Sequence, residues 1–213
     1  MEEFGHTLHT RRQMLHALVG LPATLALASF AGLTVRPMMP EALAQAPTLP
    51  PTPACTDGDE ITPRQMEGPY YKRSSPERAS LLEPGLTGTR LVVAGFVLSR
   101  RCQPIERALL DFWHADDQGQ YDNRGYRCRG HQFTDAAGRY HLETILPGVY
   151  PGRARHIHVK AQAPNGPLLT TQLYFPGEPH NARDRLFNPA LSLAIQDTAD
   201  GKAAQFSFIL DLS

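Results

Sequence analysis

The stretch His156-Ile157-His158-Val159-Lys160-Ala161 alternates polar and apolar side chains. Alternation with a period of two is typical of a half-buried β-strand. Arg139–Ile145 alternates in the same way, and further apolar or alternating windows lie at 91–98, 108–115, 171–175 and 205–210. Turn residues separate these windows, and only a stretch near 188–197 has a helical period. Short strands joined by turns predict an all-β fold, either a sandwich or a barrel.

The composition excludes some classes of protein. The chain has 213 residues with 21 Lys plus Arg and 21 Asp plus Glu, so its formal net charge is zero. A nucleic-acid binder would usually have a basic excess, and no nucleic-acid partner is expected. The charged fraction of 20% and the apolar fraction of 41% are those of a globular protein, which rules out wholesale disorder.

Residues 1–46 have the features of a signal peptide. The pair Arg11-Arg12 precedes the uncharged, mostly apolar stretch Leu15–Leu33, and small residues at Ala42–Ala46 offer cleavage sites. Paired arginines before an apolar stretch resemble the twin-arginine signal of bacteria, although an ordinary signal or an uncleaved anchor would also fit. The expectation is a periplasmic or otherwise exported protein that passes through the twin-arginine export machinery.

The remaining chain divides into a Pro-rich linker at 47–54 and a folded domain at 55–213. The domain contains three cysteines, Cys55, Cys102 and Cys128. An odd number of cysteines in an exported chain predicts at most one disulfide and one free thiol. The sequence does not choose the pair.

His156 and His158 are the strongest candidates for metal ligands. Residues i and i+2 of a strand point to the same face, so the two imidazoles should lie side by side, although two solvated histidines would have the same spacing. Tyr150 and Arg153 lie in a turn-rich loop just upstream, and Tyr121 follows the turn after Trp113. Imidazoles combined with phenolates suit ferric iron, whereas zinc is usually held by His, Cys and carboxylates.

Several short motifs occur together and in order over about residues 55–180, and as a set they resemble the intradiol ring-cleavage dioxygenases, the family of catechol and protocatechuate dioxygenases. The similarity is greatest to exported members of that family. The motifs are Glu67–Tyr71, Trp113–Asp116, Gly119–Tyr121, Thr134–Asp135, Gly138–Tyr140, Pro147–Tyr150, Arg153–His158 and Thr171–Phe175.

This resemblance implies a β-sandwich with long connecting loops and little helix, with 55–213 as the catalytic domain. It also implies one Fe(III) per chain. The activity implied is cleavage of a catechol-type ring by O2 between the two hydroxylated carbons, which gives a cis,cis-muconic-type diacid. The family's four iron ligands correspond here to Tyr121, Tyr150, His156 and His158.

The resemblance also assigns roles around the substrate. Tyr150 would leave the iron and take a proton from the catechol, and Arg153 and Gln172 would face the bound ring as catalytic and substrate-binding residues. Pro69 and Tyr70 would line the mouth of the cleft. The stretch between Tyr150 and His156 is shorter than in protocatechuate enzymes, which leaves the pocket for ring substituents open.

Two other classes of function compete with this assignment. A non-catalytic, transthyretin-like β-sandwich binding module would not need the two tyrosines and two histidines together. A zinc or copper hydrolase on a β scaffold would need a different ligand set. Trp113 is expected in the core, and His114 and His141 are expected at the surface. Catechol, protocatechuate, hydroxyquinol and larger catechols remain open as substrates, and so does assembly into a homo-oligomer.

Overall fold

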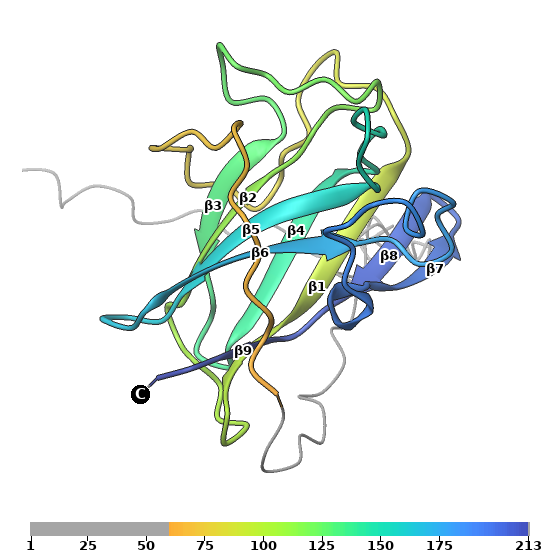
Figure 1. Ribbon diagram of the computed structural model, residues 1–213. Coiled ribbons are helices and arrows are strands. Elements are labelled where there is room, and N and C mark those ends of the chain that lie inside the picture. The colour runs from red at the N-terminus through yellow and green to blue at the C-terminus, as the bar shows by residue number, and fades with distance from the viewer. Residues whose placement is uncertain (1–59, 213) are drawn as a thin grey trace, which may run out of the picture. The chain divides into compact units, whose positions relative to one another are not determined.

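The computed structural model describes residues 60–212 (Figure 1). The predicted signal peptide at 1–46, the linker at 47–54 and Cys55 lie outside the described residues, so these assignments stay predictions. No helix in the part of the chain that the structure describes is long and apolar enough to cross a membrane.

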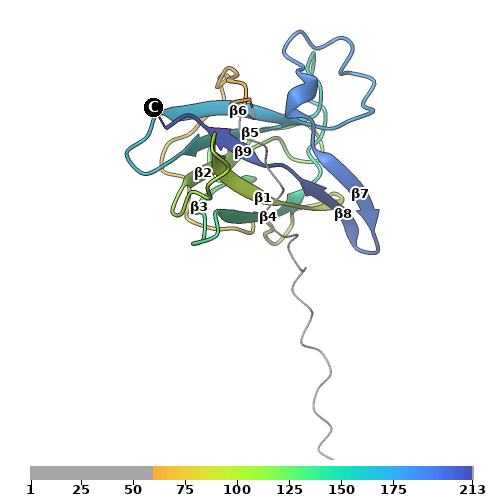
Figure 2. The same ribbon diagram turned by 90° about the horizontal axis from the view of Figure 1, so that it is seen from below.

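Residues 60–212 contain nine strands in two sheets, which confirms the predicted all-β sandwich. One sheet has the order β4-β1-β8-β7, with β9 also paired to β1, and the other has the order β3-β2-β5-β6. Figure 2 shows β5 and β6 in one layer and β1 and β4 in the other. The strands are β1 (Arg90–Ser99), β2 (Leu109–Trp113), β3 (Arg129–Phe133), β4 (Arg139–Ile145), β5 (His156–Gln162), β6 (Leu168–Tyr174), β7 (Ala194–Thr198), β8 (Gly201–Gln205) and β9 (Phe208–Leu210).

The stretch near 188–197 does not form a helix over its length, although its sequence has a helical period. Its helical part is one short 3₁₀ turn, η1 (Pro189–Leu191), in which Asn188 accepts a hydrogen bond from the Ala190 N–H. The chain then leaves the helical conformation at Ser192 and enters β7, which pairs along its length with β8. Strand pairing therefore overrides the local helical period at this position.

The apolar faces of the two sheets form the core. Leu91 and Val93 of β1 and Leu142 of β4 pack in one buried cluster with the inward residues of β2 and β5. On β5 those inward residues are Ile157 and Val159, so the alternating histidines and Lys160 point away from the core. Gly95 of β1 is required by close packing, because a Cβ there would stand 1.8 Å from the Phe206 carbonyl oxygen.

Residues 60–80, which we call the strap, cross the outer face of the β3-β2-β5-β6 sheet (Figure 1). Backbone hydrogen bonds hold the strap there: Gln65 N–H donates to Thr170 O at 2.8 Å, and Arg78 N–H donates to His131 O at 2.8 Å. Because the strap covers this face, polar side chains on this face of the sheet are shielded from water.

The cysteines agree with the prediction of one disulfide and one free thiol. Cys102 is disulfide-bonded. Cys128 is a free thiol and is buried.

Candidate metal centre and substrate cavity

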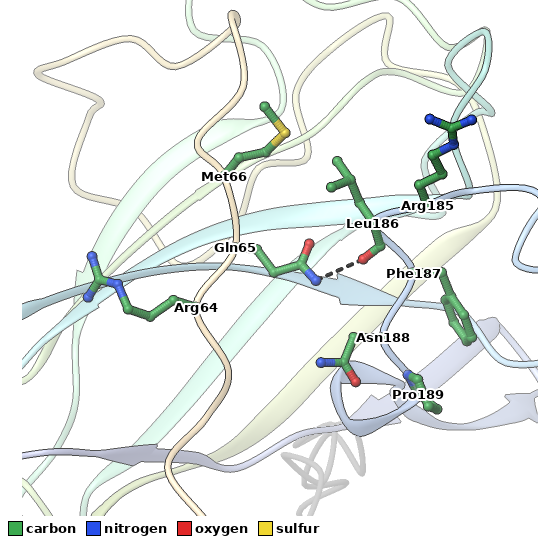
Figure 3. A pocket seen from close by; sticks show the side chains of 8 residues that line it. All are labelled: Arg64, Gln65, Met66, Arg185, Leu186, Phe187, Asn188 and Pro189. Carbon is green, nitrogen blue, oxygen red and sulfur yellow. Dashed lines mark hydrogen bonds between the residues drawn. The ribbon is translucent and has the colours of Figure 1, made fainter.

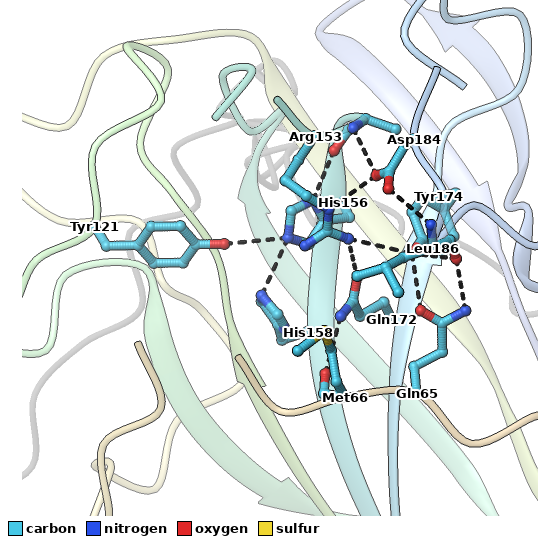
Figure 4. Close-up of polar contacts among 11 residues, drawn as sticks. Gln65, Met66, Tyr121, Arg153, His156, His158, Gln172, Tyr174, Asp184 and Leu186 are labelled. Carbon is cyan, nitrogen blue, oxygen red and sulfur yellow. Dashed lines mark hydrogen bonds and ion pairs between the residues drawn. The ribbon is translucent and has the colours of Figure 1, made fainter. Parts of the chain in front are cut away.

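His156 and His158 lie side by side on the outer face of β5, and both are buried beneath the strap. Their Nε2 atoms are 3.1 Å apart, and the Tyr121 hydroxyl lies 3.3 Å from Nε2 of His156 (Figure 4). Trp113 stands opposite His158 in the β2–β5 register, and the two rings stack at 4.8 Å with an interplanar angle of 5°. Three of the four predicted iron ligands therefore converge on one point.

Both histidines are suited to bind a metal as neutral imidazoles. Burial, reinforced by the Arg153 charge, lowers the pKa of His156 to about 4, and burial and the neighbouring His156 hold the pKa of His158 well below its usual value. The Nδ1 atom of His156 lies 2.6 Å from Ala154 O, so this nitrogen carries the proton and Nε2 keeps its lone pair. Gly68, whose φ of +73° favours glycine, brings the strap against the His158 ring.

Tyr150 lies in the same cavity in a different arrangement. Its hydroxyl is 2.7 Å from the hydroxyl of Tyr70, and it makes no hydrogen bond to either histidine among the described residues. The Tyr70 ring stacks on Tyr121 at 4.4 Å, so Tyr70 contacts both predicted tyrosine ligands. Burial raises the pKa of Tyr121, and a bound cation would lower it again.

The donor atoms fit a hard metal ion. Two ligand atoms about 2.1 Å from one ion and at right angles to each other are about 3.0 Å apart, close to the separation of the two Nε2 atoms. No cluster of three His, Cys, Asp or Glu side chains in residues 60–212 is placed to hold a metal. A metal here would therefore need tyrosine as a ligand, as ferric iron would accept.

A cavity of about 220 Å³ opens directly over these atoms. An apolar cavity of about 150 Å³ holds benzene, so this space has room for one substituted aromatic ring. Every predicted site residue except Gln172 lines this cavity. The full lining consists of Met66, Gly68, Pro69, Tyr70, Tyr121, Tyr150, Arg153, His156, His158 and Leu186.

Arg153 lines the cavity, and its guanidinium is held on two sides. Nη2 donates to Gln172 Oε1 at 2.6 Å, and Nε donates to Asp184 Oδ2 at 2.9 Å (Figure 4). Asp184 also accepts from the backbone N–H groups of Ala154 at 2.8 Å and Leu186 at 2.9 Å. Burial alone would raise the pKa of Asp184, but these N–H groups and Arg153 outweigh it, so the pKa lies below its usual value.

Arg155 has a different environment. It pairs with Glu178 at 3.0 Å and donates to the Pro147 carbonyl oxygen. Arg153 therefore lines the cavity, whereas Arg155 is held by Glu178 and Pro147.

Sequence reasoning missed Asp184, which lies in a long loop without strand periodicity. The surface position expected for His114 is wrong. That side chain is 1% exposed and lies 2.7 Å from both Thr144 Oγ1 and Ala115 O, and burial lowers its pKa to about 4. Trp113 is buried as expected, but it packs behind His158 on the outer face of the sheet.

The sequence pattern of a protein family described as Dioxygenase matches residues 66–211. The chain belongs to the intradiol dioxygenase family, whose members include catechol, protocatechuate and hydroxyquinol dioxygenases.

Individual relatives support the assignment of the chain to this family. The dioxygenase domain of a dioxygenase–carbohydrate-binding protein fusion from Streptomyces sp. SirexAA-E is 55% identical, covers 72% of this chain and 100% of its own, and superimposes with a TM-score of 0.71. The protocatechuate 3,4-dioxygenase beta chain of Burkholderia cepacia is 36% identical over 118 residues, which is 47% of this chain and 50% of that one. Catechol 1,2-dioxygenase of Acinetobacter baylyi is 27% identical over 155 residues, 59% of this chain and 50% of that one. The chain thus spans about half the length of these curated relatives.

Proposed function

We propose that the chain is a non-haem, Fe(III)-dependent intradiol dioxygenase that cleaves a catechol-type ring with O2 to a cis,cis-muconic-type diacid. The observation that carries this proposal is the convergence of the Tyr121 hydroxyl and the two histidine Nε2 atoms at the floor of a ring-sized cavity. A non-catalytic, transthyretin-like module is not favoured, because the relatives that the chain matches are dioxygenases.

Tyr121, Tyr150, His156 and His158 would hold one iron per chain. When bound, ferric iron would supply Lewis-acid and template chemistry toward a chelating catechol. A catechol must lose protons to chelate, and the phenolate oxygen of Tyr150, deprotonated while it serves as a metal ligand, would accept one of them and become a neutral hydroxyl. Tyr70, whose hydroxyl lies 2.7 Å away, would hydrogen-bond Tyr150 in either protonation state.

Arg153 and Gln172 would act on the ring itself. Negative charge develops on the ring during oxygen attack, and a guanidinium fixed in place beforehand can offset that charge without reorganising. Gln172 accepts the hydrogen bond that orients Arg153, and its amide in turn donates to Met66 O of the strap at 2.9 Å. Pro69 and Tyr70 would contact the substrate from the strap side of the cavity.

Two accessory assignments are part of the proposal. Export through the twin-arginine route would move a folded chain, so iron could be inserted before the protein reaches a compartment where copper and zinc compete for the site. The second assignment is assembly into a homo-oligomer. The paired arginines at 11–12 motivate the first assignment.

The test is iron content, colour and O2 consumption of the purified protein. We expect about one iron per chain, a visible tyrosinate-to-iron band, and one O2 consumed per catechol cleaved. His156→Ala and His158→Ala should each lose most of the iron, while His141→Ala, on β4, serves as the matched control. If both ligand variants keep full iron and colour, the ligand assignment is wrong.

A further inference from the structure

Arg129, the first residue of β3, is buried close to the predicted metal ligands. It pairs with Trp113 of β2, and Trp113 pairs in turn with His158 of β5, so the three residues form one row across the sheet. Residues directly opposite each other on paired strands project to the same face, and the strap covers this face. Arg129 is 1% exposed, so its guanidinium is removed from water beside the candidate metal centre.

The charge of Arg129 lacks a counter-charge. In residues 60–212 this side chain forms no ion pair, and its Nη2 atom has no hydrogen-bond partner. The Asp122 carboxylate accepts instead from three backbone N–H groups within residues 124–127. Arginine stays protonated in proteins, and a buried charge without a partner is strongly unfavourable. A negative group is therefore expected beside Arg129 in the functional protein.

Other arginines of the chain do not carry this cost. Arg153 pairs with Asp184 at 2.9 Å, and Arg64 and Arg185 are exposed to water. The last two line a hollow of about 510 Å³ between the strap and the segment after β6, but their guanidinium groups turn away from it and from each other (Figure 3). Burial of an unpaired charge therefore sets Arg129 apart from these three arginines.

The hydrogen bonds of Arg129 reach the backbone of two stacked tyrosines. Its Nη1 atom donates to Tyr70 O at 2.6 Å, and its Nε atom donates at 3.1 Å to the carbonyl oxygen of Asp122, the residue after Tyr121. The Tyr70 and Tyr121 rings stack at 4.4 Å with an interplanar angle of 11°. The guanidinium carbon lies 6.0 Å from the centre of the Tyr121 ring, within the range of a cation–π contact. One side chain thus holds the backbone behind both rings and places positive charge beside one of them.

We propose that Arg129 is a positioning residue of the metal centre, which holds the Tyr70–Tyr121 stack in place and is the counter-charge of the Tyr121 phenolate when that side chain binds iron. Groups behind a metal ligand fix its orientation and tune its donor strength. A fixed positive charge beside a phenolate lowers the energy of its donor electrons, so the ligand gives less electron density to the iron. The inference rests on the proposed function, because Tyr121 becomes anionic on binding iron.

The experiment separates the charge of Arg129 from its hydrogen bonds. Arg129→Gln keeps an N–H donor without the charge, Arg129→Met keeps neither, and Arg129→Lys keeps the charge without the planar fork. On the iron-loaded, full-length chain, the Gln and Met variants should shift the tyrosinate-to-iron band to longer wavelength and lower the Fe(III)/Fe(II) potential. The Lys variant should keep both near the wild-type values. Hydrogen exchange of the amides at 67–73 and 121–128 should be faster in all three variants, because each loses at least one bond to Tyr70 or Asp122.

A residue that only supports the fold would change hydrogen exchange without moving the band according to charge. The inference is overturned if the Gln and Met variants hold full iron and keep the wild-type band and potential, or if exchange is unchanged in all three variants. If neither neutral variant folds, Arg129→Lys decides the matter. A Lys variant with a band at longer wavelength than wild type overturns the inference, and one with the wild-type band and faster exchange supports it.

Arg107→Gln is the matched control, because Arg107 is an exposed arginine whose guanidinium carbon lies 5.1 Å from the centre of the Phe133 ring, which has no place in the metal centre. It should leave the band, the potential and the exchange of both segments unchanged. Iron content and colour of the wild type are measured first. A wild-type chain without iron or colour contradicts the proposed function and this inference together, whereas a wild-type chain with both leaves the proposed function standing whichever way the variants behave.

Discussion

Arg153→Ala should abolish most turnover while leaving iron bound, because the guanidinium lines the cavity but donates to Gln172 and Asp184 and not to the metal ligands. Removing one preorganised charge-stabilising group costs about two to three orders of magnitude in rate. That range corresponds to about 3–4 kcal/mol in the activation free energy.

The same substitution has a separate cost in stability. The Asp184 side chain is 3% exposed, and without Arg153 it keeps its two backbone N–H donors but loses its counter-charge. A hydrogen bond to a charged group contributes about 1.5–3 kcal/mol. Because the Arg153 side chain is itself 19% exposed and partly screened, we expect a loss of about 2 kcal/mol in the free energy of unfolding.

Arg155→Ala is the matched control. Its partner Glu178 has a side chain that is 23% exposed, so losing that ion pair should cost about 0–1 kcal/mol, and turnover should stay near that of wild type. Urea unfolding, iron content and the kcat for catechol, measured on both variants, separate the two effects. A fully active Arg153→Ala beside an inactive Arg155→Ala would move the catalytic role to Arg155, and loss of iron from Arg153→Ala would refute the separation of roles.

Three further outcomes are expected. Because the pKa of Asp184 is depressed in the folded chain, its contribution to stability is present above about pH 4 and is lost as the pH falls through the lower folded value; urea midpoints of wild type and Asp184→Asn should therefore converge in acid, and parallel curves would contradict this. Burial raises the pKa of Cys128 to about 12, so one thiol should react with a thiol reagent after unfolding and almost none before; three reactive thiols under denaturing, non-reducing conditions would refute the disulfide. Trp113→Leu should cost about 3 kcal/mol of stability and broaden the visible band, whereas Trp113→Phe, which keeps an aromatic ring against His158, should cost less; equal effects would show that the stacking has no such role.

The strands and the histidine pair could be predicted because both depend on local periodicity. Alternation along 156–161 identified β5 and also placed His156 and His158 on one face, which the structure confirms. The burial of His114 could not be predicted in this way, because it depends on Thr144, a residue of β4, which belongs to the other sheet. The helical period near 188–197 failed for the same reason, since pairing with β8 decides the conformation there.

The cavity could not be predicted from local sequence patterns. Its walls come from segments distant in sequence: the strap supplies Met66, and the loop after β6 supplies Leu186 and the carboxylate that holds Arg153. The role of the strap arises from backbone bonds such as Gln65 N–H to Thr170 O, which depend on register and not on side-chain type. The resemblance to a known family could assign a role to Arg153. That Asp184 holds the Arg153 guanidinium in place could be seen only in the structure.

One arrangement of charge connects Arg153 to the predicted metal ligands. Burial, reinforced by the Arg153 charge, lowers the pKa of His156, so the positive charge that would stabilise an anionic substrate also helps to keep that imidazole unprotonated and free to bind a metal. Asp184 fixes this guanidinium and is itself held by backbone N–H groups, so the local charge does not depend on mobile surface residues. An anionic ring in the cavity would therefore meet the fixed positive charge of Arg153 beside imidazoles that stay neutral, so one guanidinium would serve both the substrate and the metal ligands.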